Sequence, residues 1–443
     1  MKKTRKILFS AALLSSGLTM AQTTTAEKSP NVIYIMADDL GIGDLGCYGQ
    51  RQIKTPNIDG IAQNGMKFMQ HYSGSTVSAP SRCALITGKH MGHAAIRGNA
   101  KVAGSDGLLY ETPLPAGEVT VADIFKTKNY VTGCVGKWGM GGPGTEGMPG
   151  KHGFDYFYGY LGQRFAHSYY PEFLHENEQK IMLDGKYYSH DLMLEKALNF
   201  IDENAQKPFF LYFSPTIPHA DLDIMGEVMT EYEGEFCETP FGGSKDGYKS
   251  QQTPRAAYAA MVTYLDKSVG LIIKELKEKG LYDHTIIVFT SDNGVHSEGG
   301  HDPSYFDSNG PFRGQKRDLY EGGIRTPFVI QWPGVIPQGV VTNHISAFWD
   351  FLPTLTGKGI QKEHDCIYYE FFEFGGKQSI MTPDGWKLVR LEVSDPSKTY
   401  EELYNIYTDP AETTNVIKQY PDVARKLKNM IGGQRVENAR FHF

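Results

Sequence analysis

Short apolar runs alternate with stretches of helical periodicity along most of the chain. The runs predict buried strands over residues 31–36, 130–135, 208–214, 285–290 and 327–332. Apolar residues at helical spacing predict helices over residues 58–68, 121–128, 191–204 and 256–279. Such alternation predicts an α/β fold in which helices sandwich a mostly parallel sheet.

The pattern changes beyond Pro353. Short alternating segments at 378–381, 386–391 and 402–407 accompany a Thr-Pro-Asp-Gly turn, and a helical pattern starts at about Pro421. These elements predict a small antiparallel α+β domain. We therefore expect one large domain over residues 28–356 and a C-terminal sheet-and-helix domain over residues 357–443.

The N-terminal segment has the composition of an export signal. A basic head, Met1 to Lys6, precedes an apolar run from Ile7 to about Ala21 that ends in small residues. Residues 1–27 are therefore expected to form a signal peptide and a mature leader, and the protein to be periplasmic or secreted. No later run approaches the ~20 apolar residues that a membrane span requires, so we expect no membrane span.

Charge and cysteine content exclude several classes of function. The formal net charge of -7 argues against a nucleic-acid partner, because clustered Lys and Arg bind phosphate backbones. The five cysteines lack metal-ligand spacing and allow at most one or two disulfides. They therefore predict neither a zinc site nor a disulfide scaffold.

Polar residues directly follow four of the predicted strands. They are Asp38-Asp39, Lys137, His219 and Asp292-Asn293. Because ligands of such sheets bind at the carboxyl ends of strands, we expect the chemistry at this edge. Three carboxylates and an amide oxygen suit calcium or magnesium rather than zinc. Taken alone, each pair also fits a simple turn, with one carboxylate capping the backbone and Asn293-Gly294 forming the bend.

The segment from Ser75 to Gly88 is a second candidate for chemistry. Pro80 fixes the backbone two residues after Ser78, and Arg82 follows about one helical turn after Ser78. A buried guanidinium at this spacing would hold the Ser78 hydroxyl in place. An ordinary helix start, with Ser78 as the cap and Pro80 in the first turn, explains the same pattern.

A longer series of motifs resembles one family. In chain order the motifs are Pro30-Asn31-Val32, Ala37-Asp38-Asp39-Leu40-Gly41, Thr55-Pro56-Asn57-Ile58-Asp59, Ser78-Ala79-Pro80-Ser81-Arg82, Leu85-Ile86-Thr87-Gly88, Gly136-Lys137-Trp138, Pro218-His219, Ser291-Asp292-Asn293-Gly294, Arg313-Gly314-Gln315-Lys316 and Glu321-Gly322-Gly323-Ile324-Arg325-Thr326-Pro327. Over nearly the whole mature chain they resemble the formylglycine-dependent sulfatases of the alkaline-phosphatase superfamily. Serine at position 78 resembles the serine-type branch of bacterial carbohydrate sulfatases. The resemblance implies an alkaline-phosphatase-like fold, with residues 28–356 as the catalytic domain.

The resemblance also implies a role for each site residue. Ser78 would be oxidised to formylglycine by an anaerobic sulfatase-maturating enzyme. One hydroxyl of the aldehyde hydrate would attack sulfur, and the other would later collapse and expel sulfate. One calcium ion would be bound by Asp38, Asp39, Asp292, Asn293 and the modified Ser78. The other implied roles are hydrate binding by Arg82, charge neutralisation by Lys137 and Lys316, and protonation of the leaving alcohol by His219.

Two features depart from the family pattern. Many members carry histidine two residues after the motif lysine, where this chain has Gly139. That histidine is thought to help the hydrate collapse, and we expect His167 or His93 to replace it. The segment after Leu355 is also shorter than in relatives, which affects the domain junction and not the site residues.

An aromatic segment over residues 160–171 bears on the substrate. It resembles the segment of sulfatases that act on galactose or N-acetylgalactosamine sulfates, so we expect a sulfated glycan, contacted by Arg164 and His167. Packing of the aromatic residues inside the protein is the competing interpretation. Two other functions stay open, a phosphodiesterase or phosphonate hydrolase of the same superfamily that uses a transition metal, and a non-catalytic glycan-binding relative.

Overall fold

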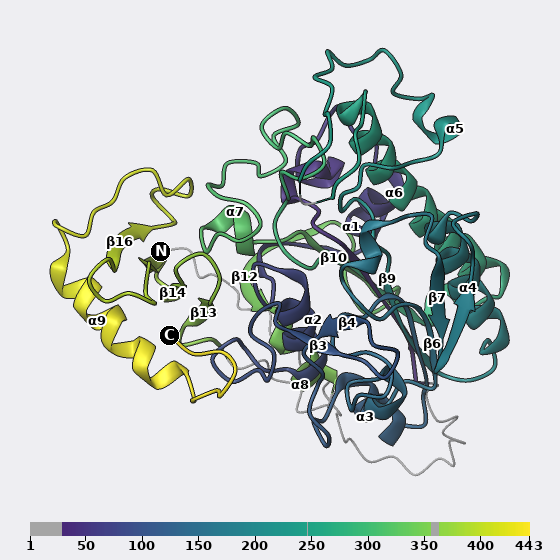
Figure 1. Ribbon diagram of the computed structural model, residues 1–443, viewed down its shortest axis with the longest axis horizontal. Helices are drawn as coiled ribbons and strands as arrows, with labels where there is room; N and C mark the ends of the chain where they lie inside the picture. The colour runs from purple at the N-terminus through teal and green to yellow at the C-terminus, as the bar shows by residue number, and fades with distance from the viewer. Residues whose placement is uncertain (1–28, 246, 356–362) are drawn as a thin grey trace, which may run out of the picture.

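Two β-sheets organise the chain. The computed structural model describes residues 29–245, 247–355 and 363–443 (Figure 1). The expected signal peptide and the region directly after Leu355 lie outside these residues. Within them, a ten-stranded sheet and a four-stranded sheet carry the fold, and a two-stranded ribbon of β3 (Lys101–Ala103) and β4 (Leu109–Glu111) is added.

The ten-stranded sheet is parallel at its centre. In spatial order its strands are β12 (Val340–Ala347), β2 (Met66–Tyr72), β11 (Phe328–Gln331), β10 (Thr285–Ser291), β1 (Asn31–Ala37), β9 (Phe209–Ser214), β5 (Val131–Lys137), β6 (Tyr156–Tyr160), β7 (Phe173–Glu176) and β8 (Gln179–Met182). The neighbouring strands β10, β1, β9, β5 and β6 pair in parallel. Strands β11 and β7 each run antiparallel to both of their neighbours, and the edge strand β8 runs antiparallel to β7. The predicted mostly parallel α/β sheet is confirmed.

Helices cover both faces of this sheet, because successive side chains of a strand point to opposite sides. Ile33 and Ile35 of β1 join one core with helices α1 (Pro56–Gln63), α4 (Ser189–Glu203) and α6 (Pro254–Glu278). Val32 and Tyr34 join a second core with α2 (Ser78–Thr87), α3 (Val121–Thr127) and the start of α8 (Phe351–Leu355). The sheet is therefore sandwiched as the sequence predicts (Figure 1).

Helix α6 is, within the described residues, the one helix long and apolar enough to cross a membrane by length and composition. In this fold, 72% of its apolar window is buried inside the protein. It packs against α1 and α4 in the first core. Such burial is typical of a core helix.

The four-stranded sheet is antiparallel and carries one helix. Its strands are β13 (Ile367–Phe371), β14 (Lys377–Met381), β15 (Trp386–Leu391) and β16 (Tyr400–Asn405), and its helix is α9 (Pro421–Ile431). Tyr369 and Met381 pack into the second core of the large sheet, whereas Tyr368 and Leu388 pack with α9. Figure 1 shows this part in yellow beside the main body. The predicted small sheet is confirmed, with β13 as an additional strand.

One boundary differs from the sequence-based expectation. The helix predicted over 58–68 ends at Gln63, and β2 begins at Met66. Gly65 lies between them, and a Cβ there would meet the Ile330 carbonyl oxygen at 2.1 Å, so the chain runs too close to β11 for a helix to continue. The strand near 327–332 runs antiparallel to β10. All five cysteines are free, so no disulfide forms.

Candidate active site

Ser78 lies at the start of α2 in the buried interior. Every residue of this helix is buried, and the residue that caps it is Val77, which makes no side-chain cap. The Ser78 hydroxyl instead donates to Asp38 Oδ1 at 3.0 Å and lies 3.3 Å from Lys137 Nζ. The interpretation of Ser78 as a helix cap is therefore wrong, because its side chain points to charged groups on other elements.

Two neighbouring strand ends bring the acidic residues near Ser78. The parallel register sets Ala37 of β1 beside Ser291 of β10, so the residues that follow these strands are neighbours. The Asp39 backbone N–H donates to Asp292 Oδ1 at 3.0 Å. Asp39 has a φ of 61°, a left-handed conformation that is uncommon for residues other than glycine and that clusters at functional sites.

The carboxylates of Asp38, Asp39 and Asp292 form a candidate metal centre. One oxygen of each lies within 4.8 Å of the others, and all three residues are fully buried. Asn293 Nδ2 donates to Asp39 Oδ1 at 2.6 Å, while Asn293 Oδ1 is buried without a hydrogen-bond partner in the structure. Converging carboxylates repel one another unless a cation lies between them. The oxygen donors and the unpartnered amide oxygen fit a hard divalent cation.

Two cations hold the Asp38 side of the site. Lys137 Nζ donates to Asp38 Oδ2 at 2.6 Å. Arg82 donates to Asp292 Oδ2 at 2.9 Å and to the Lys137 carbonyl oxygen at 2.9 Å. Burial alone lowers the pKa of Arg82, but Tyr212, Asp292 and Asp38 outweigh it and raise the pKa above its usual value. Arg82 is therefore a permanent cation behind Ser78.

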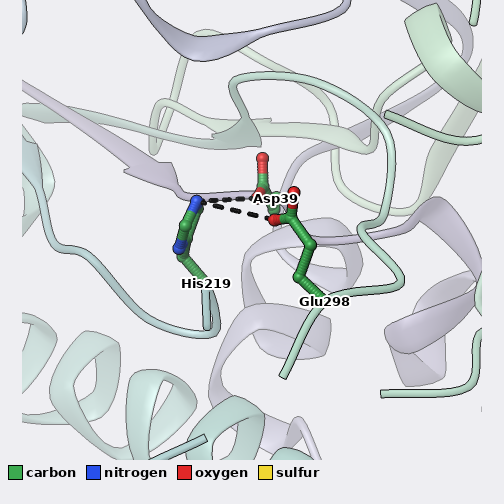
Figure 2. Close-up of side chains that lie close together, drawn as sticks. All are labelled: Asp39, His219 and Glu298. Atoms are coloured by element: carbon green, nitrogen blue, oxygen red, sulfur yellow. Dashed lines mark ion pairs between the residues drawn. The ribbon is translucent and has the colours of Figure 1, made fainter. Parts of the chain in front are cut away.

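Lys316 organises the Asp39 side. Its Nζ contacts Asp39 Oδ2 at 2.7 Å, Glu298 Oε2 at 2.8 Å and His219 Nε2 at 3.1 Å. Figure 2 shows His219 facing both Asp39 and Glu298, with Nε2 at 3.3 Å from Asp39 Oδ2 and 4.0 Å from Glu298 Oε2. Burial, Lys316 and Lys137 hold the pKa of His219 well below its usual value. His219 is neutral here, with Nε2 accepting from Lys316.

Sequence reasoning missed Glu298. This residue follows no predicted strand and belongs to none of the motifs, so the sequence offers no signal for it. It enters the site because the loop after β10 folds back toward Lys316 and His219.

A family model described as "Sulfatase" matches residues 30–357. The chain belongs to the sulfatase family. It is 31% identical to N-acetylgalactosamine-6-sulfatase of Canis lupus familiaris over 77% of this chain and 65% of the relative. It thus spans slightly less than two thirds of that relative's length.

Two further relatives are covered almost completely. N-acetylgalactosamine-6-O-sulfatase of Bacteroides thetaiotaomicron is 28% identical over 91% of this chain and 93% of the relative. The crystal structure of Ps i-CgsB in complex with k-i-k-neocarrahexaose has a TM-score of 0.77 and 28% identity, and it covers 94% of this chain and 95% of that one. These similarities confirm the alkaline-phosphatase-like fold.

The departure from the sulfatase pattern at Gly139 has a structural cause. Gly139 has a φ of 73°, and a Cβ there would lie 2.1 Å from Gln163 Nε2. No side chain fits at this position without displacing Gln163. Of the two expected replacements, His167 lies near the site, with its ring 4.7 Å from that of His219 and tilted by 35° to it. His93 is exposed and has its ring 4.7 Å from that of His90.

Most of the aromatic segment before His219 serves the interior. Tyr160 and Tyr169 are buried in the first core, as the packing interpretation predicts for these residues. The Tyr169 hydroxyl donates to the His219 carbonyl oxygen at 2.6 Å and thereby supports the His219 loop. Arg164 is exposed at the start of a short helix, Phe165–His167. Burial, followed by Lys137 and Lys316, lowers the pKa of His167 to about 3.

Proposed function

We propose that this protein hydrolyses a sulfate ester of a carbohydrate at a formylglycine made from Ser78, with one calcium ion beside it. One observation carries the proposal. In a chain of the sulfatase family, the Ser78 hydroxyl lies 3.0 Å from a carboxylate oxygen of a converging acidic cluster and 3.3 Å from a lysine ammonium.

The oxygen donors support calcium as the metal. Asp38, Asp39, Asp292 and Asn293 would bind the ion together with the modified Ser78. Bound there, the ion would lower the pKa of the hydrate and polarise the sulfate. The group of Asp38, Asp39 and Asp292 contains neither a sulfur nor an imidazole ligand, and His219, which groups with Asp39 and Glu298, contacts Lys316 through Nε2. These features favour a hard cation over zinc.

The surrounding side chains would bind the hydrate, stabilise charge and transfer a proton. A plain serine would keep the sulfate as a stable ester, whereas a hydrate has a second hydroxyl that expels sulfate when it collapses. Arg82 would hold the hydrate, and Lys137 and Lys316 would neutralise charge on the sulfate oxygens. His219 directs Nε2 into the site, where this nitrogen accepts from Lys316. After taking a proton, for which the Lys316 ammonium is the adjacent donor, Nε2 would pass it to the departing alcohol.

The relatives support a sugar substrate. Two of them are named for N-acetylgalactosamine 6-sulfate ester hydrolysis, and a solved relative holds a neocarrahexaose. Galactose or N-acetylgalactosamine sulfates are therefore the proposed substrates, with Arg164 and His167 at the sugar. His167 is also the proposed replacement for the histidine that Gly139 displaces. An unchanged rate of sulfate release in His167→Ala, in both burst and steady state, excludes that second role.

Export and maturation complete the proposal. The basic and apolar composition of residues 1–27 supports delivery to the periplasm or the exterior. A serine at position 78 supports oxidation by an anaerobic sulfatase-maturating enzyme before export. We assign catalysis to residues 28–356, and we assign residues 357–443 to the small sheet-and-helix domain.

Two measurements on protein from its native host test the proposal. The mass of the peptide that contains Ser78 should be lower by two hydrogens, which reports the aldehyde. The same preparation should release sulfate from N-acetylgalactosamine and galactose sulfates in the presence of calcium. An unmodified Ser78 without sulfate release contradicts the proposal. Zinc-dependent cleavage of phosphodiesters or phosphonate esters would favour the phosphorus-ester hydrolase instead.

A further inference from the structure

We propose that Glu298 is a positioning residue that fixes the ammonium of Lys316 for the reaction. The proposal rests on the function proposed above, in which Lys316 neutralises sulfate charge. Glu298 contacts Lys316 directly and reaches His219 Nε2 only at 4.0 Å. It therefore acts on the chemistry through Lys316.

Both oxygens of the Glu298 carboxylate are held by cations. Oε2 accepts from Lys316 Nζ at 2.8 Å, and Oε1 pairs with Arg317 NH2 at 2.6 Å. The Lys316 side chain is 7% exposed and that of Glu298 is 13% exposed. Because so little solvent reaches it, the pair of Lys316 and Glu298 is screened much less than a surface pair.

The backbone at Arg317 allows two consecutive residues to hold one carboxylate. Side chains of adjacent residues normally diverge, but Arg317 has a φ of 77°. A left-handed conformation costs about 1–3 kcal/mol for a residue other than glycine, and such residues cluster at functional sites. The Arg317 N–H also donates to the Thr76 carbonyl oxygen, two residues before Ser78.

A second tie fixes the loop that carries Glu298. The Glu298 backbone N–H donates to His296 Nδ1 at 3.0 Å, which leaves the proton of the neutral ring on Nε2. His296 Nε2 then donates to the carbonyl oxygen of Pro218 at 3.1 Å, directly before His219. The Glu298 loop and the His219 loop are thus held as one unit.

Lys316 needs this second carboxylate because its other anionic partner is Asp39. Asp39 belongs to the acidic cluster that fits a cation. With Asp39 engaged there, Glu298 remains as the anion that holds the ammonium beside His219. Loss of Glu298 would leave Lys316 free to shift toward Asp39 or outward.

The decisive measurement is the crystal structure of the Glu298→Gln variant with and without calcium, because it does not depend on activity. We expect Lys316 Nζ to move by about 1 Å or more, a misplacement that costs about a hundredfold in rate when it affects reacting groups. In the mature enzyme we expect kcat/KM to fall by about tenfold to a hundredfold. Lys316 in its original place in Glu298→Gln overturns the proposal.

A double-mutant cycle separates positioning from direct contact with substrate. If Glu298 acts through Lys316, Glu298→Gln has no further effect in the Lys316→Met background, whereas an equal loss in both backgrounds contradicts the proposal. Arg317→Gln should displace Lys316 in the same direction as Glu298→Gln does, but by a smaller distance. Glu231→Gln, which breaks the exposed pair with Lys54, is the matched control and should leave structure and rate unchanged.

A wild type without sulfatase activity would refute the proposed function alone, since the crystal structures still decide the role of Glu298.

Discussion

The edge around Ser78 and the junction between the two sheets both bury carboxylates with lysine and arginine. We call the second group, Glu321, Arg325, Lys387 and Glu412, the junction cluster. There Lys387 Nζ lies 2.8 Å from Glu321 Oε1 and 2.9 Å from Glu412 Oε1. Arg325 NH2 lies 2.6 Å from Glu321 Oε2. Each acid in this cluster thus has a cation against it, and Lys387 lies between the two acids.

The edge around Ser78 is built differently from the same residue types. Oxygens of three carboxylates converge within 4.8 Å, and an amide oxygen beside them lacks a partner. In the described residues, the groups able to hold a metal ion occur at this edge and not at the junction. Burial of charge therefore does not distinguish a site from a structural cluster. Convergence of three like-charged oxygens does distinguish them. An acceptor without a hydrogen bond does not, because Glu412 Oε1 at the junction also lacks one.

The largest difference between the two regions is expected when the Ser78 hydroxyl is removed. Ser78→Ala should lower sulfate release by about 10⁴-fold or more, because a nucleophile of a covalent mechanism is lost. Its melting temperature should stay near that of the wild type. Ser75→Ala removes a buried hydroxyl that makes no hydrogen bond through Oγ in the structure, so it should retain activity. Equal activity of the Ser78 and Ser75 variants would contradict the assignment.

The junction cluster should show the opposite response. Lys387→Met leaves two buried carboxylates without their shared cation and should lower the free energy of unfolding by about 3–5 kcal/mol. Urea denaturation measures this loss, and the folded fraction should keep its kcat. Lys398→Met breaks an exposed pair with Asp395 and should cost well under about 1 kcal/mol. A large loss of kcat in Lys387→Met would place the junction in the reaction.

Metal removal tests the open cluster directly. Calcium at about 100 times its dissociation constant should raise the free energy of unfolding by about 2.7 kcal/mol over the chelated protein. Asp39→Asn removes one charged donor and should weaken this stabilisation. Lys387→Met should respond to calcium like the wild type. Stabilisation by zinc but not by calcium would contradict the assigned metal.

A third kind of buried acid, Asp44, has no cation against it and gives an effect that depends on pH. Asp44 accepts from the Gly41 N–H, the Tyr258 hydroxyl and the Ser308 hydroxyl, which are all neutral. Burial raises its pKa from 3.8 to about 6, against the lowering effect of these hydrogen bonds. The protonated form is favoured by folding, so its stabilisation is complete below about pH 4 and is lost as pH rises through 6.

The variant Asp44→Asn isolates this titration. Wild-type stability should decline relative to the variant between about pH 4 and pH 7, by about 3 kcal/mol. Urea denaturation at several pH values measures the difference. Parallel pH profiles of the two proteins would show that Asp44 remains ionised.

Much of the fold and part of the site could be predicted from the sequence. Apolar periodicity is local, and it correctly indicated β1, β5, β9 and β10. Because parallel strands end at one edge, the adjacency of Asp38, Lys137 and Asp292 to those strands also predicted their approach. The helix predicted for residues 64–68 was wrong because Met66 and Phe68 pair with β11, a strand that lies far along the chain.

The sequence by itself determined the strand-and-helix alternation, the small C-terminal sheet and the family motifs, because each depends on neighbouring residues. Only the tertiary structure decided that Glu298 forms ion pairs with both Arg317 and Lys316. It also decided that Gln163 occupies the space beside Gly139 and that Tyr169 supports His219 from the core. These contacts join segments separated by many residues. The local pattern of apolar and polar residues does not specify which distant side chain will contact a given position.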